Sequence, residues 1–162
     1  MEEPRLTPTQ LGGYFAFMEV GSLLRHAVEQ QLKEVGGLSY VQFQLLARLQ
    51  DAGGSQRMTD LADGVVYSRS GLTYQAQLLE QRGLVTRAPS ADDERSTVVT
   101  LTEAGRGVLA DVFPGHIDTV SSLLFASMTD GDVDEFARIL GRAAEHLREI
   151  PPRSAAPRRR RA

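Results

Sequence analysis

Two short helical segments joined by an unusually tight connection constrain the fold of this chain more than any other feature. The first, "MTDLADGV", begins with a Thr59 cap, and the second, "SRSGLTYQAQLLEQRG", begins at Ser68 and ends before Gly83. They are joined through "VVY", which leaves room only for a tight turn. Two helices connected in this way are typical of a helix-turn-helix.

A pair of β-prone runs follows the second helix directly. "LVTRA" (84–88) and "TVVTL" (97–101) flank the charged loop "PSADDERS", which predicts an antiparallel hairpin. A helix-turn-helix followed by a hairpin is a winged helix, whose second helix enters the major groove of DNA while the wing reaches the minor groove or backbone. Arg95 is the candidate for that minor-groove contact, and one of the preceding acids would orient it or tie the loop to its own domain. A merely solvated hairpin loop is the alternative.

Long amphipathic helices flank this central part. Their apolar residues recur every three or four positions; glycine ends the first two of these helices and proline ends the last. We expect a kink or a break at Pro114, which lies inside the third of them. The expected flanking helices are Thr9 to about Val35, Ser39 to about Asp51, Thr102 to about Ser127, and Thr129 to Ile150.

Composition excludes several classes of protein. The chain has 162 residues and no Cys, so disulfides and thiolate metal sites are absent, and its three His lack ligand spacing, so we expect no metal and no cofactor. No nucleophile motif or phosphate-binding glycine loop is present, so we expect no enzyme. No apolar run approaches a membrane span and the N-terminus is polar, which favours a cytoplasmic protein that does not contact membranes.

The net charge of −3 is unevenly distributed. The tail 151–162 holds five of the 18 Lys and Arg residues and no acid, which leaves 13 basic and 21 acidic residues elsewhere, a balance of −8. DNA binding must therefore depend on local placement of cations. The tail, with its run Arg158 to Arg161, is expected to stay disordered, and either adds nonspecific phosphate contacts or is simply solvated.

"LSYVQFQLLARL", "MTDLADGVVYSRSGLTYQAQLLEQRGLVTR" and "DDERSTVVTLTEAG" together resemble the MarR family of winged helix-turn-helix transcriptional regulators. The match runs in register from about Leu38 to Gly105, and the flanking helices fit in length and order. The wing pattern Asp93-Glu94-Arg95, followed by β-branched residues and Leu-Thr-Glu-x-Gly, is the most specific part. Tyr74, where Arg or His is frequent, Gln75, where an aliphatic residue is usual, and Gly71 inside the helix depart from the family pattern.

The resemblance implies a mainly α fold in which a winged helix-turn-helix with a small β-hairpin wing is carried by dimerisation helices from both termini. It also implies a homodimer on a pseudo-palindromic operator with half-sites about 34 Å apart. The apolar stripes of the terminal helices independently require a partner surface. The expected divisions are a dimerisation helix (1–37), a DNA-binding lobe (38–101, recognition helix about 68–82, wing about 84–101), C-terminal dimerisation helices (102–150) and the tail (151–162).

On the recognition helix, Leu72, Ala76 and Leu79 share a face that should pack inward. Polar residues occupy the remaining arc. Arg69 suits guanine or a phosphate, Gln77 suits adenine, and Tyr74 suits a phosphate or a thymine methyl group. Ser68 is alternatively a plain helix cap. The candidate DNA-binding residues are Ser68, Arg69, Ser70, Thr73, Tyr74, Gln77 and Arg95.

The resemblance further implies a small phenolic or lipophilic effector bound where the dimerisation helices meet the DNA-binding lobe. Aromatic, Met and His side chains at the start of the chain could line such a pocket, although stripes of this kind more often belong to the core. The candidates are Tyr14, Phe17, Met18, His26, Tyr40 and Phe43.

The sequence therefore predicts a homodimeric, sequence-specific regulator that binds double-stranded DNA and acts as a ligand-responsive repressor. The alternative is a winged helix used for protein–protein interaction without sequence-specific DNA binding, which the acidic body and Tyr74 favour slightly. The sequence specifies neither the operator, nor the target genes, nor the effector, nor repression against activation.

Overall fold

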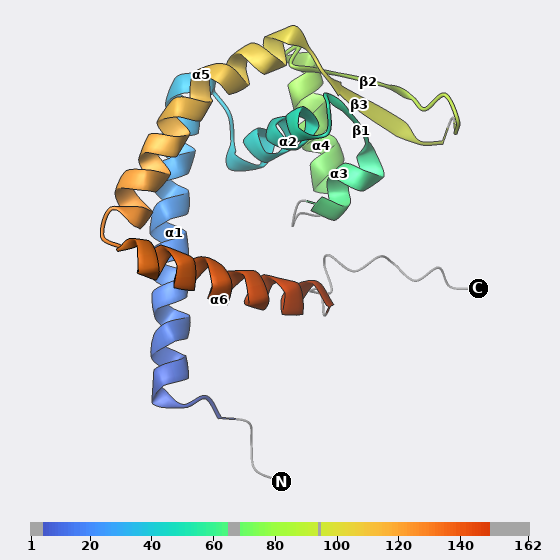
Figure 1. The fold of residues 1–162 in the computed structure, drawn as a ribbon. Coiled ribbons are helices and arrows are strands. Elements are labelled where there is room, and N and C mark those ends of the chain that lie inside the picture. The colour runs from blue at the N-terminus through green and yellow to red at the C-terminus, as the bar shows by residue number, and fades with distance from the viewer. Residues whose placement is uncertain (1–4, 65–68, 94, 150–162) are drawn as a thin grey trace, which may run out of the picture.

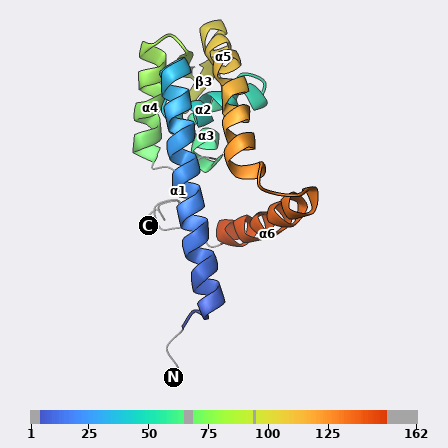
Figure 2. The same ribbon diagram turned by 90° about the vertical axis from the view of Figure 1, so that its left-hand side faces the viewer.

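Helix α1 (Pro8–Gly36) opens the fold, and local sequence sets both of its ends. Thr7 and Gln10 form a reciprocal capping box, and Pro8 follows the cap, where its missing N–H costs nothing. Gly37 ends the helix in the left-handed conformation, with φ of 60°. In the computed structural model, which describes residues 5–64, 69–93 and 95–149, the N-terminal half of α1 extends away from the rest of the chain (Figures 1 and 2).

The winged-helix lobe follows. Helix α2 (Tyr40–Asp51) begins with a second capping box, formed by Ser39 and Gln42, and the predicted pair of short helices follows it. The lobe contains α2, β1 (Ser55–Arg57), α3 (Met58–Gly64), α4 (Arg69–Gln81), β2 (Val85–Pro89) and β3 (Thr97–Leu101).

The wing is a three-stranded antiparallel sheet of order β1-β3-β2 rather than the expected two-stranded hairpin. Strands β2 and β3 pair from Val85 opposite Leu101 to Pro89 opposite Thr97, as predicted to within one residue. Strand β1 was missed because three residues are too few to show alternation. The backbone carbonyl of Gly54, a residue with φ of 101°, accepts from the N–H of Leu101 and so begins that pairing.

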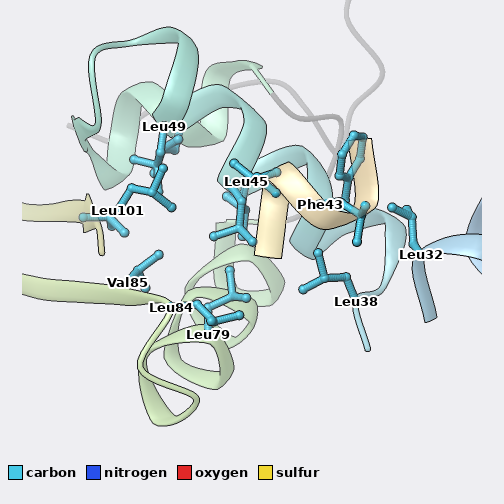
Figure 3. Close-up of a cluster of buried hydrophobic side chains, with 14 of the residues drawn as sticks. Leu32, Leu38, Phe43, Leu45, Leu49, Leu79, Leu84, Val85 and Leu101 are labelled. Atoms are coloured by element: carbon cyan, nitrogen blue, oxygen red, sulfur yellow. The ribbon is translucent and has the colours of Figure 1, made fainter. Parts of the chain in front are cut away.

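One apolar core joins the lobe to the long helices (Figure 3). The side chains of α2 lie at its centre and contact residues from α1, α4, the wing and α5. Its fully buried members include Leu32, Leu38, Leu45, Leu46, Leu49, Leu72, Leu79, Val85, Val99 and Val112. Because this core includes the ends of both α1 and α5, the lobe is seated directly on the long helices.

Helix α5 (Glu103–Val120) runs beside α1 and returns the chain from the wing (Figures 1 and 2). We expected a kink or a break at Pro114. The helix is continuous through that residue, so no break occurs, and its axis is curved in Figure 1. The regular hydrogen bonding changes only at a π-helical turn, Ser121–Phe125. Helix α6 (Asp130–Glu149) follows, and none of its residues is buried in the single chain.

Several expectations fall outside the described residues: the start of the recognition helix at Ser68, the role of Glu94, the end of the last helix at Ile150, and the tail 151–162. Within the described ranges, none of the helices combines the length and apolar character needed to cross a membrane.

Candidate DNA-binding surface

Helix α4 presents a polar face to solvent because its apolar face is fully committed to the core. Leu72, Ala76 and Leu79 are each at most 1% exposed, which confirms the predicted inward face. The candidates on the other side, Ser70, Thr73, Tyr74 and Gln77, are all exposed, Tyr74 at 56%. The helix therefore offers hydroxyl, phenol and amide groups together on one accessible arc.

The beginning of the same helix is described only in part. Arg69 is the first residue of α4, but its side chain and all of Ser68 lie outside the described residues. Their assignment to DNA binding rests on sequence alone. The capping role considered for Ser68 has the same standing.

The wing tip is ordered by its acidic residues. The Asp93 side chain accepts a hydrogen bond from the backbone N–H of Arg95 (3.0 Å), and the Asp93 carbonyl accepts from Ser96 (2.9 Å). Asp92 forms an ion pair with Arg57 of β1 (3.5 Å). Arg95 itself is exposed. We expected one of the acids to orient Arg95 or to tie the loop to its own domain; Asp92 ties the loop to β1, and Asp93 fixes the backbone at Arg95, while the role of Arg95 in DNA binding stays a prediction.

An ion pair that the sequence did not suggest connects α4 to the wing. Oε1 of Glu80 accepts from the backbone N–H of Arg87 (3.0 Å), while Oε2 accepts from Nε (2.8 Å) and lies 2.7 Å from Nη2 of the same guanidinium. Both side chains are at most about one third exposed. Since the pair is partly desolvated and held by three bonds, it fixes β2 relative to α4 more firmly than a surface ion pair would.

The structure also accounts for the unusual Gln75. Its side-chain oxygen accepts a hydrogen bond from Nε2 of Gln42 (3.0 Å), which is 8% exposed. Gln42 is the capping-box residue of α2, and its own oxygen accepts from Ser39 N–H. A polar residue at position 75 therefore pairs with a buried amide, whereas an aliphatic residue there would remove the acceptor of Gln42 Nε2.

The candidate effector residues are dispersed in the single chain. Phe43 is 6% exposed and packs on His116 at 4.7 Å between ring centroids, while Tyr40 lies under the guanidinium of Arg25 at 5.0 Å. Tyr14, Phe17 and Met18 are each more than half exposed, and His26 is also exposed. Because a helix rises about 1.5 Å per residue, Tyr14 and His26 are about 18 Å apart along α1. One chain does not bring the six together, and their role stays a prediction.

The sequence did not point to two polar residues in this part of the fold, Gln31 of α1 and His116 of α5, the second of which contacts Phe43. Gln31 of α1 donates from Nε2 to the carbonyl of Val112 (3.0 Å), and Gly115 makes room for its side chain. Within the described part of the chain, Gln31 Oε1 and His116 Nδ1 are buried without a hydrogen-bond partner. Burial lowers the pKa of His116 below its ordinary value, so this imidazole is neutral at physiological pH.

The described residues contain no cluster of His and acidic side chains able to hold a metal ion. The exposed groups of α4 and the wing can form hydrogen bonds and ionic contacts with a partner. Together they provide a rigid polar helix face and an ordered arginine-bearing loop.

Comparison with known proteins gives a consistent result. Residues 36–96 match the family model described as MarR family. The chain is 27% identical over 114 residues to the HTH-type transcriptional regulator MhqR of Bacillus subtilis. This alignment covers 70% of this chain and 77% of that protein.

Two solved structures extend the likeness to nearly the whole chain. Sco3205 of Streptomyces coelicolor, a MarR family transcriptional regulator crystallised in complex with DNA, is 30% identical with a TM-score of 0.85, covering 94% of this chain and 95% of Sco3205. AbsC of the same organism, also a MarR family transcriptional regulator, is 31% identical with a TM-score of 0.84, covering 91% and 99%.

Proposed function

The chain belongs to the MarR family of transcriptional regulators, and we propose that it acts as a homodimeric repressor that binds a pseudo-palindromic operator in double-stranded DNA. Such regulators catalyse no reaction, in agreement with the expectation that the protein is not an enzyme. The observation that carries the proposal is the polar face of α4 opposite a fully buried face, with Arg95 on an ordered wing beside it. Sco3205, which shares 30% of its sequence with this chain, was crystallised with DNA.

Each candidate contact has a chemical role in this proposal. Gln77 and Arg69 contact base edges in the major groove, and Tyr74 contacts a phosphate or a thymine methyl group. Ser68, Ser70 and Thr73 bind phosphates near the start of α4. Arg95 enters the neighbouring minor groove, where its guanidinium meets concentrated negative potential. The rest of the body is acidic, so these few cations would give weak nonspecific affinity and a marked dependence on salt.

The dimer follows from apolar surface that the single chain leaves uncovered. In α1, Phe15, Phe17 and Leu23 are 56% to 65% exposed, and in α6 Leu147 is 62% exposed. Exposed apolar area of this extent on two helices is typical of a surface that another protein covers. A second copy satisfies both helices at once, and its two-fold axis would present two α4 helices to adjacent major grooves. The proposal also assigns the protein to the cytoplasm, where its DNA partner lies.

The effector site is proposed to form only in the dimer. Tyr14, Phe17 and Met18 lie on the N-terminal half of α1, which extends away from the lobe. Tyr40 and Phe43 lie in the first turn of α2, close to the C-terminal end of α1. The α1 helix of a second copy can lie against that first turn of α2, and His26 would then line the same space. A small phenolic or lipophilic molecule would fill it, with its hydroxyl satisfying a buried polar atom.

The decisive test is selection from a random-sequence duplex library at two salt concentrations. We expect enrichment of a pseudo-palindrome with half-sites about one helical turn apart. Arg95→Glu and Arg69→Glu should abolish the enrichment, while Arg142→Glu, an exposed change on α6 away from its apolar stripe, should not. Phenol and a medium-chain fatty acid then serve as probes for release of the selected duplex.

Two outcomes would contradict the proposal. If the wild-type protein enriches no sequence and shows only weak, salt-labile binding, the DNA-binding function fails. If both charge reversals leave duplex binding unchanged, the assigned surface is wrong. In the first case the winged helix is better explained as a protein-interaction module, and partners of the α4 face should be sought.

A further inference from the structure

The C-terminal end of α1 has backbone carbonyls that its own cap does not satisfy. Gly37 N–H donates to the Lys33 carbonyl (3.0 Å), which is the bond of an αL cap, and Leu38 N–H donates to the Leu32 carbonyl (3.1 Å). The carbonyls that follow, of Gly36 and Gly37, have no donor within the helix. They lie at the negative end of the helix dipole, where a cation is favoured.

Arg82, the residue directly after α4, supplies that cation. Its two terminal nitrogens donate to the Gly36 and Gly37 carbonyls, each at 2.9 Å. The planar guanidinium spans two adjacent oxygens with fixed geometry, which a lysine ammonium cannot do. The left-handed Gly37 brings its carbonyl into reach, and a Cβ at that residue would lie 3.4 Å from the guanidinium.

Arg82 is itself held rigidly at the end of α4. Its N–H donates to the Leu78 carbonyl (3.3 Å), and the next residue, Gly83, ends the helix with φ of 71°. Leu84 N–H then donates to the Leu79 carbonyl (3.0 Å), and both leucine side chains are buried. The two hydrogen bonds of Arg82 therefore connect two fixed helix ends rather than two mobile loops.

We propose that Arg82 is a positioning residue that fixes the orientation of the recognition helix relative to the dimerisation helix α1, and thereby sets the half-site spacing that the dimer accepts. This inference rests on the proposed function. In a two-fold dimer any rotation of the lobe about the end of α1 is applied at both half-sites, so a small change in each lobe alters the distance between the two α4 helices.

An arginine near the end of a recognition helix would ordinarily be assigned to a DNA phosphate. Here both terminal nitrogens already donate to carbonyls of α1. The two roles make different predictions. A phosphate contact contributes about 0.9 to the slope of log K against log salt concentration, whereas a contact within the protein contributes nothing to it.

The test uses the full chain as wild type, Arg82→Ala, Arg82→Lys and, as a control that removes the same charge from an exposed site on α6, Arg142→Ala. Binding is measured to the duplex selected by the wild type and to derivatives whose half-sites are one or two base pairs closer or further apart. Each titration is repeated at several salt concentrations. Thermal unfolding of each variant at one protomer concentration shows whether it is folded.

For Arg82→Ala we expect affinity for the selected spacing to fall about tenfold, or about 1.4 kcal/mol. Affinity for the altered spacings should fall much less, so that the difference in affinity between spacings becomes smaller. The slope of log K against log salt concentration should stay that of the wild type. Arg82→Lys should lie between wild type and Arg82→Ala, because it keeps the charge and loses the fork. Arg142→Ala should match the wild type.

The other outcomes overturn the inference. A salt slope smaller by about 0.9 with unchanged spacing preference would make Arg82 a phosphate contact. An equal loss at every spacing, together with a lower melting temperature, would mean that Arg82 only stabilises the fold. If the wild type shows no preference for any spacing, the proposed function fails and this inference fails with it.

Discussion

Two glycines of α5, two residues apart, should respond to the same substitution in opposite directions. A Cβ added at Gly105 would collide with the backbone carbonyl oxygen of Leu84 and lie 2.7 Å from Cδ1 of Leu101. A Cβ added at Gly107 would have no atom within 4 Å. The variants Gly105→Ala and Gly107→Ala therefore share their helix and their chemistry and differ only in what surrounds the new methyl group.

The magnitudes follow from this geometry. Replacing glycine by alanine inside a helix gains about 0.5–1 kcal/mol, and Gly107→Ala should show that gain. At Gly105 the gain is outweighed, because overpacking a core costs about 1–3 kcal/mol. The Leu84 carbonyl cannot retreat easily, since it accepts from Thr102 N–H (3.1 Å) and belongs to a buried residue. Because the helix gain is common to both variants, we expect them to differ in free energy of unfolding by the overpacking cost, about 1–3 kcal/mol.

Urea unfolding followed by circular dichroism, at one protomer concentration, measures the difference. Gly105→Ala should also weaken operator binding, because relief of the clash moves Leu84 and with it the base of the wing. Gly107→Ala should bind as wild type does. Stabilisation of both variants, or equal destabilisation of both, would refute the reasoning from the Leu84 carbonyl.

Three further changes test the site. Glu80→Gln should weaken the α4–wing connection to Arg87, lowering the free energy of unfolding by about 1 kcal/mol in urea titrations and reducing operator affinity. Asp93→Ala should reduce operator affinity on the order of threefold to tenfold, because it frees the backbone at Arg95. Asp93→Asn keeps an acceptor and should bind the operator as the wild type does. Equal losses of affinity in the two variants would contradict a role for the Asp93 hydrogen bond in ordering Arg95. The pKa of His116 is lowered in the folded state, so the unfolded state takes up the proton first. The melting temperature should therefore fall as the pH drops below about 6.5, less steeply in His116→Gln.

The recognition helix could be predicted because its pattern has a single physical cause. Leu72, Ala76 and Leu79 recur at helical spacing, and burying them determines which residues remain outside. The wing strands were predictable for a similar reason, since a β-branched run on each side of a polar loop favours a hairpin. The role of the acids near Arg95 could also be anticipated, because a short polar loop has few other means of becoming ordered.

What could not be predicted depends on contacts between segments distant in sequence. Strand β1 exists because β3 offers it an edge, and three residues carry no periodicity of their own. Pro114 interrupts hydrogen bonding locally, yet the packing of α5 beside α1 keeps the helix continuous. Gln75 departs from the family pattern, and the reason is its hydrogen bond to Gln42, which lies 33 residues away in the sequence.

The same contacts show why the effector site was the hardest part to anticipate. The sequence indicates which residues are aromatic but not which copy of the chain contributes them. Phe43 belongs to the core of its own chain, while Phe17 is 56% exposed and requires a surface from elsewhere. Helical spacing along one chain therefore cannot establish that the two share a pocket.

The contacts around the corner between α1 and α2 give the proposed repressor a physical route from effector to DNA. From α4, Arg82 bonds to the carbonyls at the end of α1, and Gln75 bonds to Gln42 in the first turn of α2. Tyr40 and Phe43, two candidate effector residues, belong to that same turn of α2. A ligand that displaces this turn must strain or break bonds that hold the recognition helix, so its binding and operator binding would oppose each other reciprocally. The coupling requires no change of conformation within α4 itself. It requires only that the groups bound by Arg82 and Gln75, at the end of α1 and the start of α2, change position.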